Sequence, residues 1–295
     1  MRGPLIAALA LISGTLTASA RQAAAPTLAD LLSQGAAYVE AFEAQFALAV
    51  SDEDYEQVVT RWVGSRASTE LVQRRVTQSE MVFVWLPHEQ LWLATRNVRS
   101  IDGEPVVGSD GALSAAMAPT ADERARRLRR LRNEGARINI GPIGRNFSDP
   151  TLPLQFLAAP LQPRFAWTLT HEETLAGVAT WRIDYEERSS PTLIKRGTLD
   201  MPAQGSVWIQ AGTGAVVRTT LRLDDRDVRT HVDMDVLFKN EPKLEVWAPS
   251  RMSETYTRAG APRSAISRED RVVCTARYSN YRRFDTAVRV LPATP

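Results

Sequence analysis

The pattern of apolar positions first predicts a long helix near the N-terminus. Between residues 27 and 50, apolar residues recur near helical spacing, which is typical of a helix that lays one face against a larger body. Thr27 is a suitable N-cap because its hydroxyl oxygen can accept a hydrogen bond from the first turn. We expect the acidic residues Asp52, Glu53 and Asp54 to mark the end of this helix. The apolar face consists of Leu28, Leu31, Leu32, Val39, Phe42, Phe46 and Ala49.

From Tyr55 onward the pattern changes to short runs that are rich in Val, Trp and Thr, which is typical of β-strands. Such runs cover residues 58–62, 70–76, 81–86 and 91–98, and a turn signal, Asp102-Gly103, follows the last one. We expect successive strands of an antiparallel meander. A second helix is predicted over residues 121–134, with Asp122 and Glu123 in its first turn and Gly135 at its end.

A loop and a short apolar segment at residues 152–157 follow this helix, and nearly all of the remaining chain has the pattern of strands. The predicted strands cover residues 165–174, 178–187, 207–210, 215–223, 228–238, 244–247, 252–257 and 271–284. The expected fold class is therefore α+β, dominated by a large curved antiparallel sheet with an N-terminal helix and an internal basic helix packed on it.

One predicted hairpin can be examined position by position. If Leu223 opposes Val228, then Arg218 opposes Asp233, and one face of the pair is largely apolar while the other is mostly charged. Such a division fits a sheet that is covered on one side and wet on the other. The pairing also places Arg222 opposite Arg229, which is its one unfavourable contact.

Residues 1–20 match the layout of a secretory signal peptide. Arg2 gives a basic start, residues 5–16 are almost uninterruptedly apolar, and Ala18-Ser19-Ala20 supplies small residues for cleavage. A membrane anchor or a buried helix is the alternative, but the apolar run is too short to span a bilayer. We expect a single β-rich domain over residues 21–295, exported to the periplasm or the extracellular space. Because no cysteine follows the signal segment for lipid attachment, the mature protein is expected to be soluble.

The charge of the chain points to no nucleic-acid partner, because the formal net charge is only +2. The most unusual charge feature is the predicted helix at residues 121–134. It carries Arg124, Arg126, Arg127, Arg129, Arg130 and Arg132. One hypothesis is that Arg126, Arg127, Arg129 and Arg130 contact anionic lipid headgroups or an acidic partner. The alternative is a solvated helix whose arginine stems cover the sheet.

Residue types that carry catalysis do not form a recognisable pattern. The chain has no Gly-x-Ser-x-Gly, no phosphate-binding Gly-rich loop, no His-Glu-x-x-His and no Ser-x-x-Lys. The lone cysteine, Cys274, lies in an alternating run and is interpreted as a buried structural thiol. His231, Asp233 and Asp235 alternate along one strand, as a metal-ligand set or as an ordinary solvated face with Arg218 as a partner. We expect no catalytic residue, no metal and no cofactor.

The seven tryptophans all fall in or at the ends of predicted strands. Strand aromatics usually belong to a core, but several on one concave face would make a wall for an acyl chain. The candidates for this wall are Trp85, Trp92, Trp167, Trp181, Trp208 and Trp247.

Two short segments and the order of elements carry a resemblance. Residues 207–218, with Gly212-Thr213-Gly214 at the centre, resemble a strand–Thr-Gly–strand hairpin of the periplasmic lipoprotein-carrier and lipoprotein-sorting proteins (LolA/LolB-like). Residues 276–284 are similar to the last strand of exported bacterial proteins of unassigned function. The resemblance implies a half-open antiparallel barrel around helices, with an apolar concavity for lipid or acyl chains. The mature chain is longer than these carriers.

Three functions follow from these observations, in order of preference. The first is a non-catalytic binding protein for a lipid, an acyl chain or a lipidated partner. The second is an envelope interaction or assembly factor that uses the sheet edge and the basic helix around a filled interior. The third is an envelope hydrolase. A deep apolar cavity would separate the first from the second, and a buried, convergent set of ionisable groups would favour the third.

Overall fold

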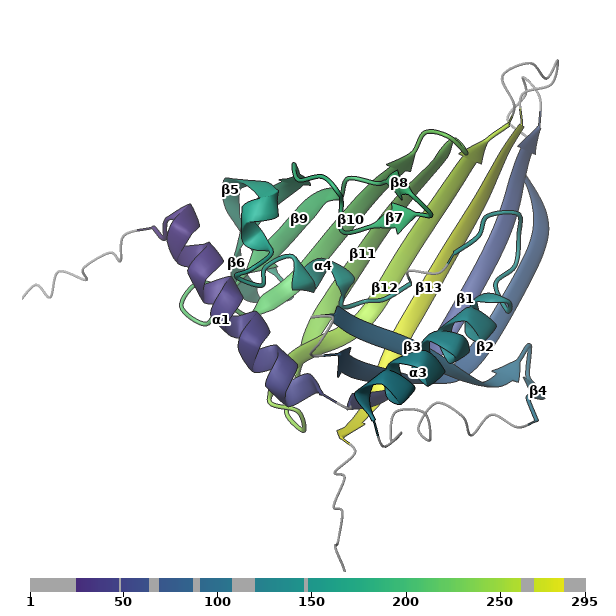
Figure 1. Ribbon diagram of the computed structural model, residues 1–295, viewed down its shortest axis with the longest axis horizontal. Helices are drawn as coiled ribbons and strands as arrows, with labels where there is room; N and C mark the ends of the chain where they lie inside the picture. The colour runs from purple at the N-terminus through teal and green to yellow at the C-terminus, as the bar shows by residue number, and fades with distance from the viewer. Residues whose placement is uncertain are drawn as a thin grey trace, which may run out of the picture.

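The computed structural model describes residues 25–47, 49–63, 69–86, 91–107, 120–145, 148–260 and 268–283. The predicted signal peptide at residues 1–20 lies outside these ranges. Within them, eleven strands form one antiparallel sheet in the order β4-β3-β2-β1-β13-β12-β11-β10-β9-β6-β5 (Figure 1). The edge strands β4 and β5 lie at opposite ends of this order, so the sheet is open. This architecture confirms the predicted α+β class with a large, curved antiparallel sheet.

The strands of this sheet are β1 (Ala49–Val63), β2 (Thr69–Leu86), β3 (Leu91–Ile101), β4 (Glu104–Pro105), β5 (Phe165–Leu175), β6 (Val178–Glu187), β9 (Gln204–Ile209), β10 (Val216–Asp225), β11 (Thr230–Glu241), β12 (Val246–Ala259) and β13 (Arg268–Arg283). A separate two-stranded hairpin consists of β7 (Lys195–Arg196) and β8 (Leu199–Asp200). In two places a single strand replaces two predicted ones. Strand β2 contains both 70–76 and 81–86, and β12 contains most of 244–257.

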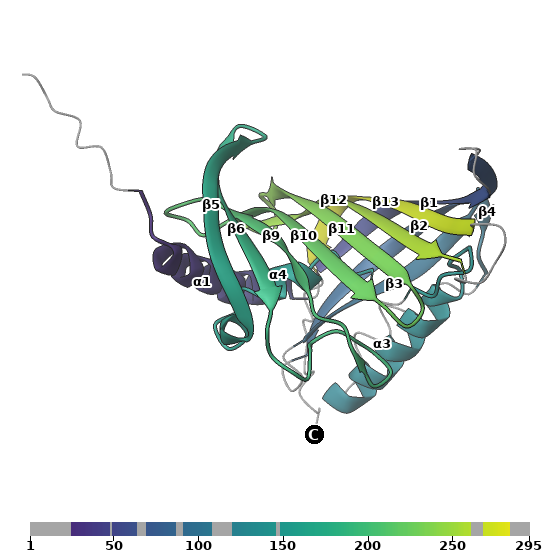
Figure 2. The same cartoon turned by 90° about the horizontal axis from the view of Figure 1, so that it is seen from above.

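The N-terminal helix α1 (Leu28–Phe46) lies on one side of the sheet, toward the end that carries β5 and β6, and α4 (Leu152–Gln155) lies on the same side, as Figure 2 shows. Thr27 caps it as predicted: its hydroxyl oxygen accepts a hydrogen bond from the Asp30 amide, and the Asp30 carboxylate accepts one from the Thr27 amide. Its buried apolar face includes Phe42 and Phe46, whose rings stack with centroids 4.4 Å apart.

The predicted end of this helix is wrong. Helix α1 ends at Phe46, and β1 begins at Ala49, so Asp52, Glu53 and Asp54 are strand residues. Acidic residues gave a misleading stop signal because Glu53 points into the core, where Arg96 holds its carboxylate with two hydrogen bonds of 2.6 and 2.9 Å. The partner of Glu53 comes from β3, far along the chain, and the local pattern does not reveal it.

The basic helix α3 (Ala121–Ala136) packs on the ends of β2 and β3, on the face that α1 does not touch (Figure 1). Met81 and Phe83 belong to the core cluster that contains Phe46, whereas Val82 and Val84 pack with Leu128 of α3. All four consecutive residues are buried, because this part of β2 is covered on both faces. A run of apolar residues without alternation is the sequence signal for such a strand.

The predicted register of the β10–β11 hairpin is wrong, although its two faces are right. Leu223 opposes Val232 rather than Val228, and the turn covers residues 226–229. The pairing differs from the prediction by an even number of positions, which keeps every side chain on the same face. The observed register places Arg222 opposite Asp233, with which it forms an ion pair, and leaves Val228 at 43% exposure in the turn.

The turn between β9 and β10 is the docking point of α1. The amide of Gly212 donates to the Gln34 side-chain oxygen at 2.8 Å. Gly214 has φ = 71°, and a Cβ built on it would lie 2.2 Å from the Gln34 carbonyl oxygen. Glycine is therefore required at this position by both the backbone conformation and the close approach of the helix.

We expect Gly214→Ala to destabilise the protein by about 2–4 kcal/mol, because α1 has to move away from the turn. Gly212→Ala is the matched control: it also has positive φ, but open space surrounds it, so it should cost only about 1 kcal/mol. Urea denaturation of both variants measures the difference. Equal losses of stability would contradict the close contact between α1 and the turn.

Candidate functional site

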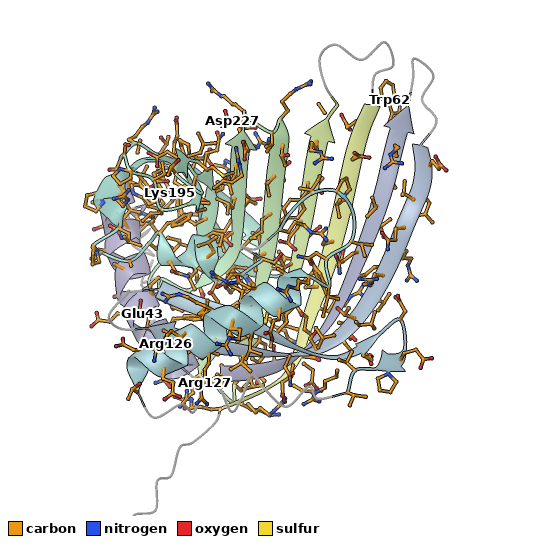
Figure 3. All side chains as sticks on the ribbon, turned by 45° about the vertical axis from the view of Figure 1, so that its right-hand side comes forward. Glu43, Trp62, Arg126, Arg127, Lys195 and Asp227 are labelled. Carbon is orange, nitrogen blue, oxygen red and sulfur yellow. The ribbon has the colours of Figure 1, made fainter. Side chains whose placement is uncertain are left out.

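A cleft of about 550 Å³ opens on the helix-bearing side of the sheet. Its floor consists of buried apolar side chains, which are Ile143, Met201, Val232 and Tyr256. Val232 and Tyr256 come from the neighbouring strands β11 and β12, while Met201 follows β8 and Ile143 belongs to the segment after α3. The β7–β8 hairpin, on which Figure 3 labels Lys195, covers one side. The cleft is thus the part of the apolar sheet face that the helices leave uncovered.

The rim of the cleft is basic. Arg137, Lys195, Arg196 and Arg258 line it, and Asp225 is the one acidic residue among the described lining residues. Arg196 binds the Asp225 carboxylate and also lies 3.4 Å from Asp227. The hydrogen bond from Arg196 holds the pKa of Asp225 below its usual value, so this carboxylate is ionised at neutral pH. Lys195 and Arg258 also lie 3.7 Å from carboxylates, those of Asp200 and Asp270, so three of the four rim cations form ion pairs.

A buried polar network lies behind the Tyr256 ring. The Glu254 carboxylate has no exposed surface and accepts hydrogen bonds from the hydroxyls of Tyr55 at 3.0 Å, Tyr256 at 2.6 Å and Ser148 at 2.7 Å. Arg145, which is 3% exposed, donates to Cys274 Sγ at 3.2 Å and also to the Gln57 side-chain oxygen. Sequence reasoning missed this set, because its members come from β1, β12, β13 and the loop after α3.

These ionisable groups converge and are buried, as the hydrolase hypothesis predicts. Their pKa shifts, however, keep the candidate nucleophiles protonated. Burial raises the pKa of Tyr55 and Tyr256 well above the usual value, and the nearby Glu254 charge adds to the shift. Burial likewise raises the pKa of Cys274 to about 12. The phenols and the thiol therefore keep their protons at neutral pH, and a nucleophile needs the opposite shift.

The predicted tryptophan wall is divided between the two faces of the sheet. Trp167 and Trp181 pack against the core, and the Trp167 ring lies 5.6 Å from that of Tyr185. Trp208 lies on the opposite face, between the guanidinium groups of Arg182 at 5.4 Å and Arg218 at 4.7 Å.

The remaining three tryptophans also lie at separate places in the sheet. Trp247 packs at the edge of the core, where its carbonyl oxygen accepts a hydrogen bond from Tyr38 of α1. Trp85 and Trp92 oppose each other in the β2–β3 pair, and their side chains lie outside the described part of the structure. None of the tryptophan side chains that the structure describes lines the cleft.

His231, Asp233 and Asp235 share one face of β11 as expected, and each of them has an ionic partner. Asp235 binds Arg218 at 2.5 Å, and Asp233 binds Arg222 at 3.1 Å. His231 lies between Asp224 at 2.6 Å and Asp233 at 2.9 Å. In the described part of the chain these side chains form an ion-pair ladder on the solvent side of the sheet, which fits the interpretation as a solvated face.

The arginines of α3 differ in their exposure. Arg126, Arg127 and Arg130 are exposed, and Figure 3 shows Arg126 and Arg127 on the outer surface of the helix. Arg129 is half-buried, and Arg127 forms an ion pair with Glu123 one turn earlier. Arg137 at the C-terminal end of α3 lines the cleft, so the basic surface of this helix continues to the basic rim.

Comparisons with known proteins give distant structural likenesses. The chain is similar to a domain from Vibrio parahaemolyticus described as an outer membrane lipoprotein-sorting protein, with 12% identity and a TM-score of 0.37 over 88% of this chain and 95% of that chain. It is also similar to a DUF1329 family protein from Desulfovibrio piger, with 11% identity and a TM-score of 0.28 over 88% and 95% of the two chains. No family model and no curated protein matches the sequence. Likenesses at this level carry no statement about a ligand.

We expect the Cys274 thiol to resist alkylation in the folded protein at mildly alkaline pH and to react fully in guanidinium chloride. Its folded pKa of about 12 exceeds the unfolded value of about 8.5. The stability that this shift supplies is therefore complete below about pH 8.5 and is lost as the pH rises toward 12. Iodoacetamide labelling read by mass spectrometry is the measurement. Ala179→Cys, at an exposed site on β6, is the control that should react at once, and equal labelling of both thiols would refute the assignment.

Proposed function

We propose that this protein is an exported, non-catalytic binding protein for an amphiphile, namely a lipid, an acyl chain or the lipid part of a lipidated partner. The observation that carries the proposal is the cleft, whose apolar floor is surrounded by a basic rim. Its volume of about 550 Å³ lies within the usual range of small-molecule sites. Each methylene that enters the cleft contributes about 0.8 kcal/mol, so a chain with several buried methylenes can offset the loss of its mobility.

The cleft also supports this function over that of an assembly factor with a filled interior. An assembly factor would use the sheet edge and the basic helix and would leave no apolar volume inside. Here Met201 and Val232 belong to the buried core and also line the cleft. The exported location rests on the signal-peptide pattern of residues 1–20. No helix in the described ranges is long and apolar enough to cross a membrane.

We further propose that the exposed arginines of α3 bring the cleft to an anionic membrane surface. Arg126, Arg127 and Arg130 face away from the sheet, and the same helix supplies Arg137 to the cleft rim. Basic residues near an anionic bilayer contribute about 1 kcal/mol each, so three of them are enough to hold the protein transiently at the surface.

We expect Gly144→Trp to reduce the binding of a fluorescent fatty acid by at least about tenfold, a change equivalent to 1.4 kcal/mol. Gly144 lines the cleft, its backbone conformation is ordinary, and no heavy atom lies within 4 Å of a Cβ placed on it. The indole can therefore enter the cleft without disturbing the fold. Fluorescence titration gives the affinity, and native mass spectrometry of the purified protein shows whether acyl chains remain bound.

The matched control for this variant is Ala179→Trp, which adds the same ring at an exposed position on β6. It should bind the fatty acid as the wild type does. If the wild-type protein purifies without lipid and also fails to bind the probe, the proposal of an amphiphile-binding cleft is wrong.

We expect replacement of Arg126, Arg127 and Arg130 by Gln to weaken binding to phosphatidylglycerol vesicles by more than about tenfold, because each lost charge removes about 1 kcal/mol. Vesicle co-sedimentation at low salt is the measurement. The charge-matched control replaces the exposed Arg74, Arg188 and Arg222 by Gln. Unchanged binding of the α3 variant, or the same loss in both, would exclude α3 as the contact surface.

A further inference from the structure

Arg145 is a buried cation whose partners are all neutral. Its guanidinium donates to the Gln57 side-chain oxygen, the Ile140 carbonyl oxygen at 3.1 Å and Cys274 Sγ at 3.2 Å. No carboxylate of the described residues lies within ion-pair distance of it, and its Nε has no hydrogen-bond partner although it is buried. The charge of a buried guanidinium is unfavourable without a counter-ion, so this side chain needs an explanation.

The position of Arg145 explains why a buried cation is present here: its side chain is only 3% exposed, and it lines the cleft. It lies next to the Tyr256 ring of the floor, with the guanidinium carbon 5.5 Å from the ring centroid. A ligand that follows the apolar floor as far as Tyr256 therefore reaches the one cation in the cleft that is shielded from water.

The nearby acidic groups are already engaged. Asp225, on the rim, is bound by Arg196, and Glu254, behind the floor, accepts three hydroxyl hydrogen bonds. Neither of them pairs with Arg145. Arg145 therefore has no direct ionic partner among the described residues, and an anion in the cleft would be one.

We infer that Arg145 binds the acidic headgroup of the amphiphile, which makes the ligand an anionic one with a carboxylate or phosphate group at its inner end. This inference rests on the proposed function of the cleft. A guanidinium presents a planar set of N–H donors that matches the oxygens of either group, and an oxyanion there would supply the missing counter-charge.

Ligand pairs with the same chain and different headgroups test the inference on the delipidated wild-type protein. We expect oleate and oleoyl lysophosphatidate to bind at least about tenfold more tightly than oleyl alcohol. Acetate and inorganic phosphate, which carry the headgroup without the chain, should not bind measurably. Equal affinities for oleate and oleyl alcohol would overturn the inference but keep the proposed function, whereas failure of all three lipids to bind would overturn the proposed function itself. Tight binding of free phosphate would show a site for small anions instead.

Arg145→Met then locates the preference, because it keeps most of the side-chain volume and removes the charge. It should bind oleyl alcohol as the wild type does and lose the preference for oleate. Arg74→Met is the control, because this exposed arginine of β2 does not line the cleft, and it should keep that preference. A preference that survives in Arg145→Met would assign it to the rim and overturn the inference.

A measurement on the wild type decides the matter if Arg145→Met does not fold. The carboxyl carbon of bound ¹³C-labelled oleate is titrated by NMR. A carboxylate beside a buried guanidinium should ionise at a lower pH than the same fatty acid held by a protein site without a cation. An ordinary titration midpoint would place the headgroup in solvent and contradict the role of Arg145.

Discussion

One face of a very wide open sheet has to be kept from water, and this chain has few helices with which to do it. Helix α1, the short α4 and the segment after α3 cover part of that face, and the ends of β2 and β3 cover another part by curling over Phe46. The sheet thus supplies part of its own cover. What remains open between these elements is the cleft, so the proposed binding site is a consequence of how the cover is distributed.

The cover also explains why polar residues lie so deep in the molecule. The segment after α3 crosses the inner face of β1 and β13 as irregular chain, and its backbone needs hydrogen-bond partners there. Gln57 accepts from the Ile140 amide, and Arg145 donates to the Ile140 carbonyl. Glu254 holds Ser148 at the far end of the same segment. The buried polar side chains therefore fasten an irregular loop to a regular sheet, and one of them, Arg145, also borders the cleft.

The sequence predicts the elements well and their long-range partners poorly. Periodicity identified the capped helix at Thr27, the basic helix and nearly every strand, because these depend on neighbours within a few residues. The β10–β11 register was misplaced because alternation fixes only the face, and an even shift preserves it. Glu53 and Arg145 were not recognised as buried, since Arg96 and Gln57 lie 43 and 88 residues away. The tryptophans suggested one wall, but only the strand order shows that Trp208 lies on the other face.

The pairing of β1 with β13 has a consequence for how the protein folds. It joins the first strand of the sheet to the last, with Asp52 held by Asn280 and Tyr55 opposite Ala276. The middle of the sheet therefore forms only when nearly the entire chain is present. Bringing β1 and β13 together closes a loop of nearly the whole chain, and this entropy loss precedes any stability that the pairing contributes. Because this topology has a high contact order, we expect slow folding. The β11–β12 and β2–β3 hairpins should form early, and the pairing of β13 with β1 should form last. A chain that stops short of β13 would expose both inner edges of the sheet at once.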